Sequence, residues 1–257
     1  MTVEPPGREV GRLLPDTWRR PVLGVLGGMG PAASVTFLDA LTRRTPARSD
    51  QDHIDTVVLS HATTPDRTAR LHDATLPDPT PYLMGDLELL GRLGADLAVI
   101  VCNTAHAFLA EELPVRLLSI VEVGAAAAVA RAREVSGGTE APAVTLLATD
   151  GTLSSRLYQE ALERRGAVVR LPEPEDQRRV MSVIYDGVKA GVPVPREEFA
   201  ALVEELRGGS DAVLLGCTEL SVLFDEAAVQ GAPLPRYVVD AQDELVDAVV
   251  TELAPGA

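Results

Sequence analysis

Three things are scarce in this sequence of 257 residues: cysteine, lysine and positive charge. The formal net charge is −15, which argues against a nucleic-acid surface because phosphates need a basic face. No stretch stays apolar for long enough to cross a bilayer, so we expect no membrane insertion. With 46% hydrophobic and 24% charged residues, the composition is that of a globular protein with one large or two smaller domains.

The chain has two cysteines, Cys102 and Cys217, and one lysine, Lys189, among its 23 basic residues. Residues 1–20 lack the apolar core of a secretory signal, so we expect a disordered or loosely docked extension and a cytoplasmic protein. In that compartment the cysteines are expected to be reduced thiols rather than a bridge. An enzyme dependent on pyridoxal phosphate would have to form its Schiff base on Lys189.

A repeated stretch contains both cysteines. Gly94-Ala-Asp-Leu-Ala-Val-Ile-Val-Cys102-Asn-Thr in the first half corresponds to Gly209-Ser-Asp-Ala-Val-Leu-Leu-Gly-Cys217-Thr-Glu in the second. In each copy an aspartate, Asp96 or Asp211, lies six residues before the cysteine, and the apolar run between them predicts a strand. A reaction that needs one thiol on each side of a substrate would have this pattern.

Each half also begins with the same kind of unit. Residues 21–33 and 143–155 both show an apolar strand, a loop of small residues and the start of a helix. We therefore predict an internal duplication: two α/β lobes with parallel sheets, related by a pseudo-two-fold axis, with the thiols on opposite sides of one cleft. The predicted division is a first lobe over 21–121 and 236–257 and a second lobe over 122–235.

Further elements follow from hydrophobic periodicity and from capping and turn residues. The predicted strands outside the repeated stretches lie at 56–60, 117–121, 167–171 and 236–240. The predicted helices cover 31–44, 83–93, 122–135, 154–165, 173–190, 198–206 and 243–253.

Polar residues follow several predicted strands, at the sheet edge where α/β proteins bind ligands. The loop Gly27-Gly-Met-Gly-Pro31 is either a tight turn or a cradle for a small anion, and its spacing does not match the dinucleotide fingerprint. Arg67 is either a clamp for a carboxylate or a solvated partner of Asp66. Lys189, near the end of a predicted helix, complements the helix dipole or serves the site.

The residues beside the cysteines bear on their reactivity. A strand end that turns into a helix places a thiol at the helix N-terminus, which lowers its pKa and favours the thiolate. His61 and His106 could tune the thiols or merely pack nearby.

Seven motifs that bracket both cysteines resemble those of the aspartate/glutamate racemase family, most closely the cofactor-independent aspartate racemases. The resemblance runs from Val22 nearly to the C-terminus. The motifs are Gly27-Gly-Met-Gly-Pro31, Asp50-Gln-Asp-His53, Pro65-Asp-Arg-Thr68, Cys102-Asn-Thr-Ala-His106, Leu147-Ala-Thr-Asp-Gly-Thr152, Ile184-Tyr-Asp-Gly-Val-Lys-Ala-Gly191 and Leu215-Gly-Cys-Thr-Glu219.

The resemblance implies two flavodoxin-like lobes with the active site in the cleft between them, a homodimer, no pyridoxal phosphate and no metal. It implies that Cys102 and Cys217 are the catalytic acid/base pair. It also implies a set of substrate-binding residues: Asn103, Thr104 and Thr218 around one carboxylate, Arg67 and Lys189 on the side-chain carboxylate, Thr149 and Thr152 at the cleft wall, and Met29. The chain departs from the family pattern at Ser60-His61-Ala62 and at Thr64, beside the Arg67 loop, so side-chain specificity could differ.

The predicted function is racemisation of an acidic amino acid, aspartate first, by proton transfer between a thiolate and a thiol at Cα. Alternatives are a related racemase or isomerase of another dicarboxylate (glutamate, a modified aspartate or maleate) and a non-catalytic protein that binds an acidic amino acid. A third alternative is a purely structural pair of buried thiols. The expected partner is a small acidic amino acid, not nucleic acid or a membrane.

Overall fold

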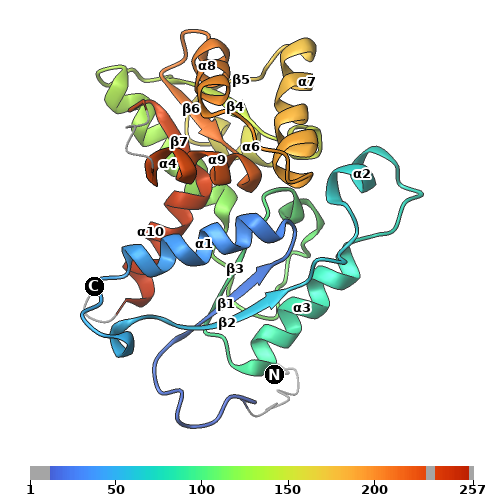
Figure 1. Cartoon of the computed structure of the whole chain (residues 1–257), viewed down its shortest axis with the longest axis vertical. Helices are drawn as coiled ribbons and strands as arrows, with labels where there is room; N and C mark the ends of the chain where they lie inside the picture. The colour runs from blue at the N-terminus through green and yellow to red at the C-terminus, as the bar shows by residue number, and fades with distance from the viewer. Residues whose placement is uncertain (1–11, 230–234, 255–257) are drawn as a thin grey trace, which may run out of the picture.

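The computed structural model describes residues 12–229 and 235–254, which form two lobes, each built on a parallel β-sheet (Figure 1). The strands are β1 (Val22–Gly27), β2 (Asp55–Ser60), β3 (Leu97–Ile100), β4 (Ala143–Leu147), β5 (Val168–Arg170), β6 (Ala212–Leu215) and β7 (Val238–Asp240). The helices are α1 (Pro31–Arg44), α2 (Arg67–His72), α3 (Thr80–Leu93), α4 (Ile120–Val135), α5 (Asp150–Ser155), α6 (Leu157–Glu163), α7 (Pro174–Ser182), α8 (Arg196–Arg207), α9 (Thr218–Val229) and α10 (Ala241–Leu253). Short 3-10 helices cover Asp50–Asp52 and Thr104–Phe108, and a π-helix covers Val183–Lys189.

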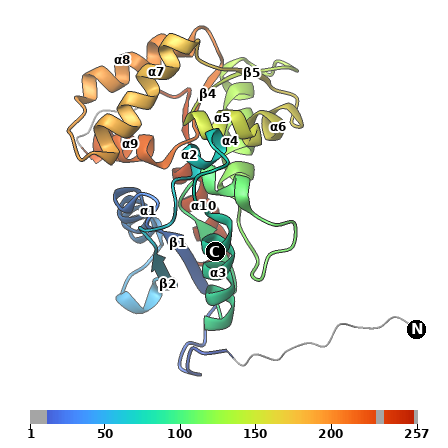
Figure 2. The same cartoon turned by 90° about the vertical axis from the view of Figure 1, so that its right-hand side faces the viewer.

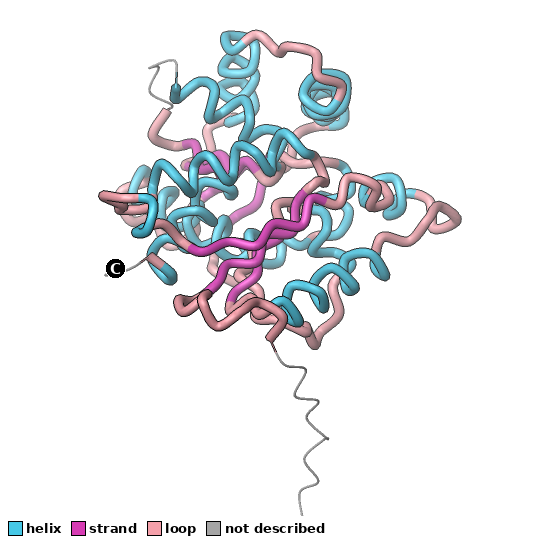
Figure 3. The backbone as a smooth tube through the Cα atoms, turned by 60° about the horizontal axis from the view of Figure 1, so that its bottom comes forward, coloured by secondary structure: helices cyan, strands magenta, loops and turns pink. Residues whose placement is uncertain are grey.

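The two sheets have the same internal order, which confirms the predicted α/β class (Figure 3). The first sheet runs β2-β1-β3 and the second β5-β4-β6-β7, and every pairing is parallel. Strand β1 is buried along its whole length, as expected of a central parallel strand with both faces covered.

The two aspartates of the repeated stretch hold equivalent positions in the two sheets. Asp96 Oδ2 accepts a hydrogen bond of 2.7 Å from the N–H of Val22, and Asp96 N–H donates back to Val22 O at 2.9 Å. Asp211 and Ala143 make the same exchange, both bonds at 2.8 Å. Each aspartate therefore fastens the start of the central strand beside it, which accounts for its place six residues before the cysteine.

Two strand predictions need correction. The predicted strand at 117–121 is reduced to a single bridge between Leu117 and Ala98, because Ser119 caps α4 and the helix already begins at Ile120. The strand predicted at 236–240 exists as β7, but it pairs with β6. The lobe boundary predicted before residue 236 is therefore wrong as drawn, since β7 completes the second sheet and α10, which follows it, returns to pack on α1.

Two predicted helices are broken. The helix predicted at 154–165 is divided into α5 and α6 at Arg156, whose φ of 60° is left-handed. The helix predicted at 173–190 is α7 followed by the π-helix. π-helical turns are frequently found at functional sites, and this one carries Tyr185 and Lys189.

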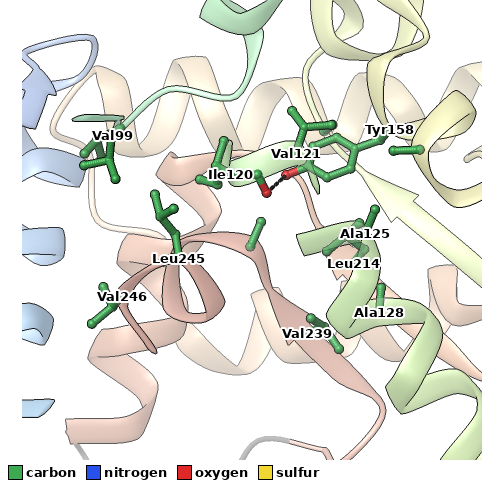
Figure 4. Close-up of a cluster of buried hydrophobic side chains, with 14 of the residues drawn as sticks. Val99, Ile120, Val121, Ala125, Ala128, Tyr158, Leu214, Val239, Leu245 and Val246 are labelled. Atoms are coloured by element: carbon green, nitrogen blue, oxygen red, sulfur yellow. Dashed lines mark hydrogen bonds between the residues drawn. The ribbon is translucent and has the colours of Figure 1, made fainter. Parts of the chain in front are cut away.

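One hydrophobic core joins the two lobes, and each lobe also contains a buried cluster of its own. One cluster of buried side chains includes Val99 of the first sheet and Leu214 and Val239 of the second, together with residues of α4 and α10 such as Ile120 and Leu245 (Figure 4). In Figure 1 α10 runs from the second lobe down beside α1. The shared core stabilises the position of one sheet relative to the other, and so of the loops at their carboxyl ends.

Helix α2 also crosses between the lobes. Figure 2 shows it beside α5, although it follows the second strand of the first sheet. The approach requires Gly151, where a Cβ atom would lie 2.8 Å from Thr68 Cα. The loop before α2 is thereby brought against the second lobe.

The ends of the chain are partly described. Of the extension predicted over 1–20, residues 1–11 lie outside the described part. Leu13 and Leu14 donate backbone hydrogen bonds of 3.1 Å to the carbonyls of Arg92 and Leu93 at the end of α3. Within residues 12–229 and 235–254, no helix is long and apolar enough to span a membrane.

Candidate active site

The two cysteines occupy equivalent strand ends. Cys102 lies two residues after β3 and Cys217 two residues after β6. The residue before each cysteine bonds to the neighbouring central strand, Val101 to Leu26 O and Gly216 to Leu147 O, at 2.9 and 2.8 Å. The repeat in the sequence is thus a repeat in space, with both thiols at the carboxyl edges of their sheets.

Both thiols line one narrow cavity. They are free and buried, Cys102 being 6% and Cys217 4% exposed. The cavity is lined by Met29, Asp66, Arg67, Thr68, Cys102, Asn103, Thr104, Thr149, Tyr185, Lys189, Cys217, Thr218 and Glu219. All ten residues that the sequence assigns to the site are in this lining except Thr152.

A wider cavity of about 430 Å³ adjoins the first and shares five of its residues: Met29, Asp66, Arg67, Lys189 and Glu219. The glycine loop and the start of α1 form one side. Ala62 and Thr64, from the loop before Arg67 that differs from the family pattern, form another. Pro31, Ala32 and Ala62 at its rim are exposed. We call the two spaces the inner and the outer cavity.

Arg67 is held rigidly by backbone carbonyls. Its Nη2 donates to Met29 O at 2.7 Å, and Nη1 donates to Pro65 O at 3.1 Å and Thr64 O at 3.3 Å. Among the described residues its buried Nε has no hydrogen-bond partner, so Nε–H remains available as a donor. The glycine loop therefore supports the arginine through Met29; that it cradles an anion remains a prediction.

The positive charge of Arg67 is stabilised by neighbouring groups of the site. Burial alone would lower the pKa of the guanidinium, but attraction to Cys102, and then to Asp66 and Glu219, outweighs it and raises the pKa. The arginine therefore stays charged beside Cys102, and neither the solvated arginine nor a simple pair with Asp66 describes it.

Cys217 has the opposite surroundings. Its Sγ donates to Glu219 Oε2 at 3.0 Å, and Lys189 Nζ lies 3.7 Å from the other oxygen, Oε1. Burial, followed by the negative charge of Glu219, raises the pKa of the Cys217 thiol well above its usual value. At Cys217, desolvation and a carboxylate in contact therefore outweigh any lowering of the thiol pKa by the N-terminus of α9.

Lys189 lies over the Tyr185 ring, with Nζ 4.5 Å from its centroid, and reaches the site from the π-helix. Burial lowers the pKa of its ammonium, but Glu219 and then Tyr185 outweigh this and raise the pKa. Lys189 is therefore a charged member of the site rather than a surface lysine at a helix end.

Asn103 is positioned by a buried tyrosine. Tyr158 donates to Asn103 Oδ1 at 2.5 Å, and burial holds the pKa of this tyrosine well above its usual value. The amide Nδ2 of Asn103 is buried and has no partner among the described residues. Asn103 therefore presents an unused donor at the inner cavity.

Four threonine hydroxyls connect the lobes at the base of the inner cavity. Thr104 Oγ1 lies 3.1 Å from Thr149 Oγ1, which also accepts from Thr68 at 3.3 Å. Thr152 is fully buried behind this wall, 2.8 Å from Thr104 and 3.1 Å from Thr149. The prediction that Thr152 lies at the cleft wall is therefore wrong. Thr152 contacts the wall residues Thr104 and Thr149 from behind and does not line the cavity.

The histidines lie outside the linings of the two cavities. His61 Nδ1 is 2.7 Å from Asp86 Oδ2, and its ring packs on Tyr82. His106 Nδ1 donates to Cys102 O at 3.1 Å, and burial lowers its pKa from 6.5 to about 4. His106 is therefore a neutral ring that supports the backbone at Cys102.

Sequence reasoning missed four lining residues: Asp66, Thr68, Tyr185 and Glu219. Tyr185 donates to Asp66 across the lobes at 3.3 Å, a contact that spacing in the sequence does not reveal. Glu219 did leave a signal, since it stands where the first copy of the repeat has Thr104. An acid two residues after one cysteine and not the other marks the halves as chemically different.

Comparisons with known proteins agree with this fold. The family model described as Asp/Glu/Hydantoin racemase matches residues 26–249. The structure of Picrophilus torridus aspartate racemase is 28% identical, covers 91% of this chain and 94% of its own, and superposes with a TM-score of 0.71. The broad specificity amino-acid racemase RacX of Bacillus subtilis (strain 168) is 25% identical over 213 residues, 79% of this chain and 88% of the relative.

A glutamate racemase of Aquifex aeolicus (strain VF5) is 28% identical over 137 residues, which are 52% of this chain. The match spans only half, 50%, of that relative's length. The family match covers both strand ends that carry the cysteines and the loops that form the cavity between them. The chain therefore belongs to the Asp/Glu/hydantoin racemase family.

Proposed function

We propose that this protein racemises an acidic amino acid, with aspartate as the first candidate, without a cofactor and with Cys102 and Cys217 as the two bases. The observation that carries the proposal is the inner cavity, which is lined by both thiols and by the ends of both parallel sheets. The same observation argues against a purely structural pair, since buried structural thiols need no common cavity beside unpaired donors.

The reaction needs two proton-transfer groups on opposite faces of one carbon. The Cα–H of an amino acid is a weak acid, and a single base would have to move around the carbanion to return the proton from the other side. With two thiols, a thiolate removes the proton while a thiol donates one, and the roles exchange for the opposite enantiomer. We further propose that a pseudo-two-fold axis relates the lobes and places the sulfurs in this way.

The carbanion develops negative charge on the α-carboxylate, which needs donors that are already in place. Asn103 Nδ2 is a buried donor without a partner among the described residues, and Thr218 begins α9 in the same lining. Thr104 belongs to the hydroxyl cluster beside them. These groups support a binding site for the α-carboxylate between the two strand ends.

A second carboxylate fits the cationic side of the cavity. The guanidinium of Arg67, whose Nε–H has no partner among the described residues, can donate to a carboxylate, and Lys189 supplies a second positive charge. Both residues also line the outer cavity, so a side chain one methylene longer than that of aspartate would extend in that direction. We therefore propose a dicarboxylic amino acid as substrate, and we rank aspartate above glutamate because the similarity to an aspartate racemase covers 91% of this chain.

The test is an assay of racemisation with each enantiomer of aspartate and glutamate, followed by optical rotation and by loss of the α-proton signal in D₂O. We expect conversion in both directions without added pyridoxal phosphate. Full racemisation by the double variant Cys102→Ser/Cys217→Ser would end the two-base proposal. Binding of aspartate without any conversion would favour the non-catalytic alternative.

A further inference from the structure

We propose that Glu219 carries protons between Cys217 and the solvent of the outer cavity, so that one of the two thiols exchanges its proton with water and the other does not. The proposal rests on the proposed racemisation and adds to it a third proton-transfer group. It starts from a contact that the two halves of the repeat do not share.

The contact is direct and buried. Glu219 Oε2 accepts from Cys217 Sγ at 3.0 Å, and the residue is 5% exposed. The other oxygen, Oε1, forms no hydrogen bond within the described part of the chain. It faces Lys189 Nζ at 3.7 Å and lies against Gly30, where a Cβ atom would be 3.1 Å away. Gly30 precedes α1, whose N-terminal partial charge favours an anion.

The position of Glu219 connects the thiol with water. It lines the inner cavity together with Cys217 and the outer cavity together with Pro31 and Ala62, both of which are exposed. One side chain thus touches the sulfur on one side and the open space on the other. A carboxylate in such a place can take a proton from one group and release it to another.

The proton balance is simple. When the Sγ–H bond of Cys217 breaks, an O–H bond forms on Glu219, and a thiolate and a neutral carboxylic acid result. The acid then loses its proton to water in the outer cavity and becomes a carboxylate again. The reverse sequence returns a solvent proton to the sulfur, and the ammonium of Lys189 stays beside the pair throughout.

Cys102 has no such path through the equivalent residue. Thr104 occupies the position of Glu219, and its hydroxyl is engaged with those of Thr149 and Thr152. The charged neighbour of Cys102 is Arg67, whose guanidinium does not release a proton at physiological pH. A proton that Cys102 takes from the substrate therefore stays available for return to the same carbon.

The difference can be measured in D₂O with each enantiomer separately. For the enantiomer whose α-proton passes to Cys217, deuterium should enter the unreacted substrate. The ratio of this exchange to inversion should be roughly threefold or more above the ratio for the other enantiomer. NMR of the α-proton measures exchange, and chiral chromatography measures inversion. Cys102→Ser, which keeps Cys217, identifies which enantiomer this is.

Glu219→Gln keeps a hydrogen-bond acceptor but cannot take up a proton. We expect it to lower the higher ratio to that of the other enantiomer, while Glu219→Asp retains part of the difference. Asp86→Asn, which changes a carboxylate on α3 that pairs with His61, is the matched control and should leave both ratios unchanged. Each ratio is internal to one sample, so it does not depend on the fraction of the variant that folds.

Equal ratios for the two enantiomers in the wild type would overturn the proposal, as would an unchanged difference in Glu219→Gln. In both cases racemisation itself is observed, so the proposed function stands. Absence of both exchange and inversion in the wild type would instead remove the proposed function, and this inference with it.

Discussion

The ends of β3 and β6 have the same backbone geometry and opposite electrostatic surroundings. In both, an aspartate fastens the neighbouring strand, and a cysteine follows two residues after the last strand residue. Cys102 faces a buried guanidinium, whereas Cys217 donates to a buried carboxylate. A duplicated scaffold can therefore give two identical side chains opposite electrostatic neighbours, and the proposed transfer between a thiolate and a thiol needs such a difference.

The largest effect should come from removing one thiol at a time. In the proposed reaction Cys102→Ser and Cys217→Ser each lose roughly a thousandfold or more in kcat, because each removes one of two proton-transfer groups. The two variants should differ in which enantiomer still exchanges its α-proton in D₂O. If both exchanged the same enantiomer, the assignment of one thiol to each face would be wrong.

The next largest effect should distinguish the roles of the two cationic residues, Arg67 and Lys189. Arg67→Lys should lower kcat/KM for aspartate roughly a hundredfold, because a lysine cannot reproduce both the carbonyl bonds to Met29 and Pro65 and a free donor for the substrate. Lys189→Arg keeps a charge near Glu219 and should cost about tenfold. Steady-state kinetics on both variants provides the test, and equal losses would contradict the different roles.

A third prediction concerns pH and the half that contains Cys102. Native His106 stays neutral down to pH about 4, while the unfolded chain takes up the proton near 6.5. The unfolded state then binds more protons between these values, so the free energy of unfolding should fall as the pH drops through this window. The loss between pH 7 and pH 5 is about 2 kcal/mol.

His106→Asn, which can still donate to Cys102 O, should remove this loss, as urea unfolding at pH 5 and pH 7 would show.

Asp240, at the end of β7, is the contrasting group in the other half. Burial, followed by repulsion from Asp243, raises its pKa from 3.8 to about 7. Between pH 3.8 and about 7 the native state keeps the Asp240 proton while the unfolded chain has lost it. Asp240 therefore contributes to the free energy of unfolding with the opposite sign, stabilising the native state as the pH falls. In Asp240→Asn the loss of stability on acidification should therefore be larger than in the wild type.

The smallest effect tests where the halves are alike. Asp96→Ala and Asp211→Ala each remove the hydrogen bond at the start of a central strand, and each should lower the free energy of unfolding by about 1 kcal/mol. Urea unfolding of the two variants gives the comparison. A much larger loss for one of them would show that the two sheets are not fastened in the same way.

The sequence was a good guide to the first sheet and a poorer one to where elements change direction. Apolar runs and the repeat predicted the central strands and α1, α3 and α4. The segment 117–121 was predicted as a strand because it is apolar, yet Ser119 caps a helix inside it. Arg156 breaks a helix through a left-handed φ that its residue type does not announce.

The site shows the same division. The motifs located both cysteines, Arg67 and Lys189, whose types fit the chemistry on their own. They did not reveal Tyr185, whose partner Asp66 is 119 residues away. They also placed Thr152 at the cavity wall, whereas it lies buried behind Thr149. Two hydroxyl residues three positions apart at a helix start look equivalent in a sequence.

By itself the sequence determined the duplication, the strand ends that carry the thiols and the membership of the chain in a racemase family, because local periodicity and motifs record these directly. Only the tertiary structure decided how the thiols differ. Their surroundings depend on charged side chains brought from other elements, Arg67 from α2 and Glu219 from α9. Such interactions act through space, so no order of residues along the chain can fix them.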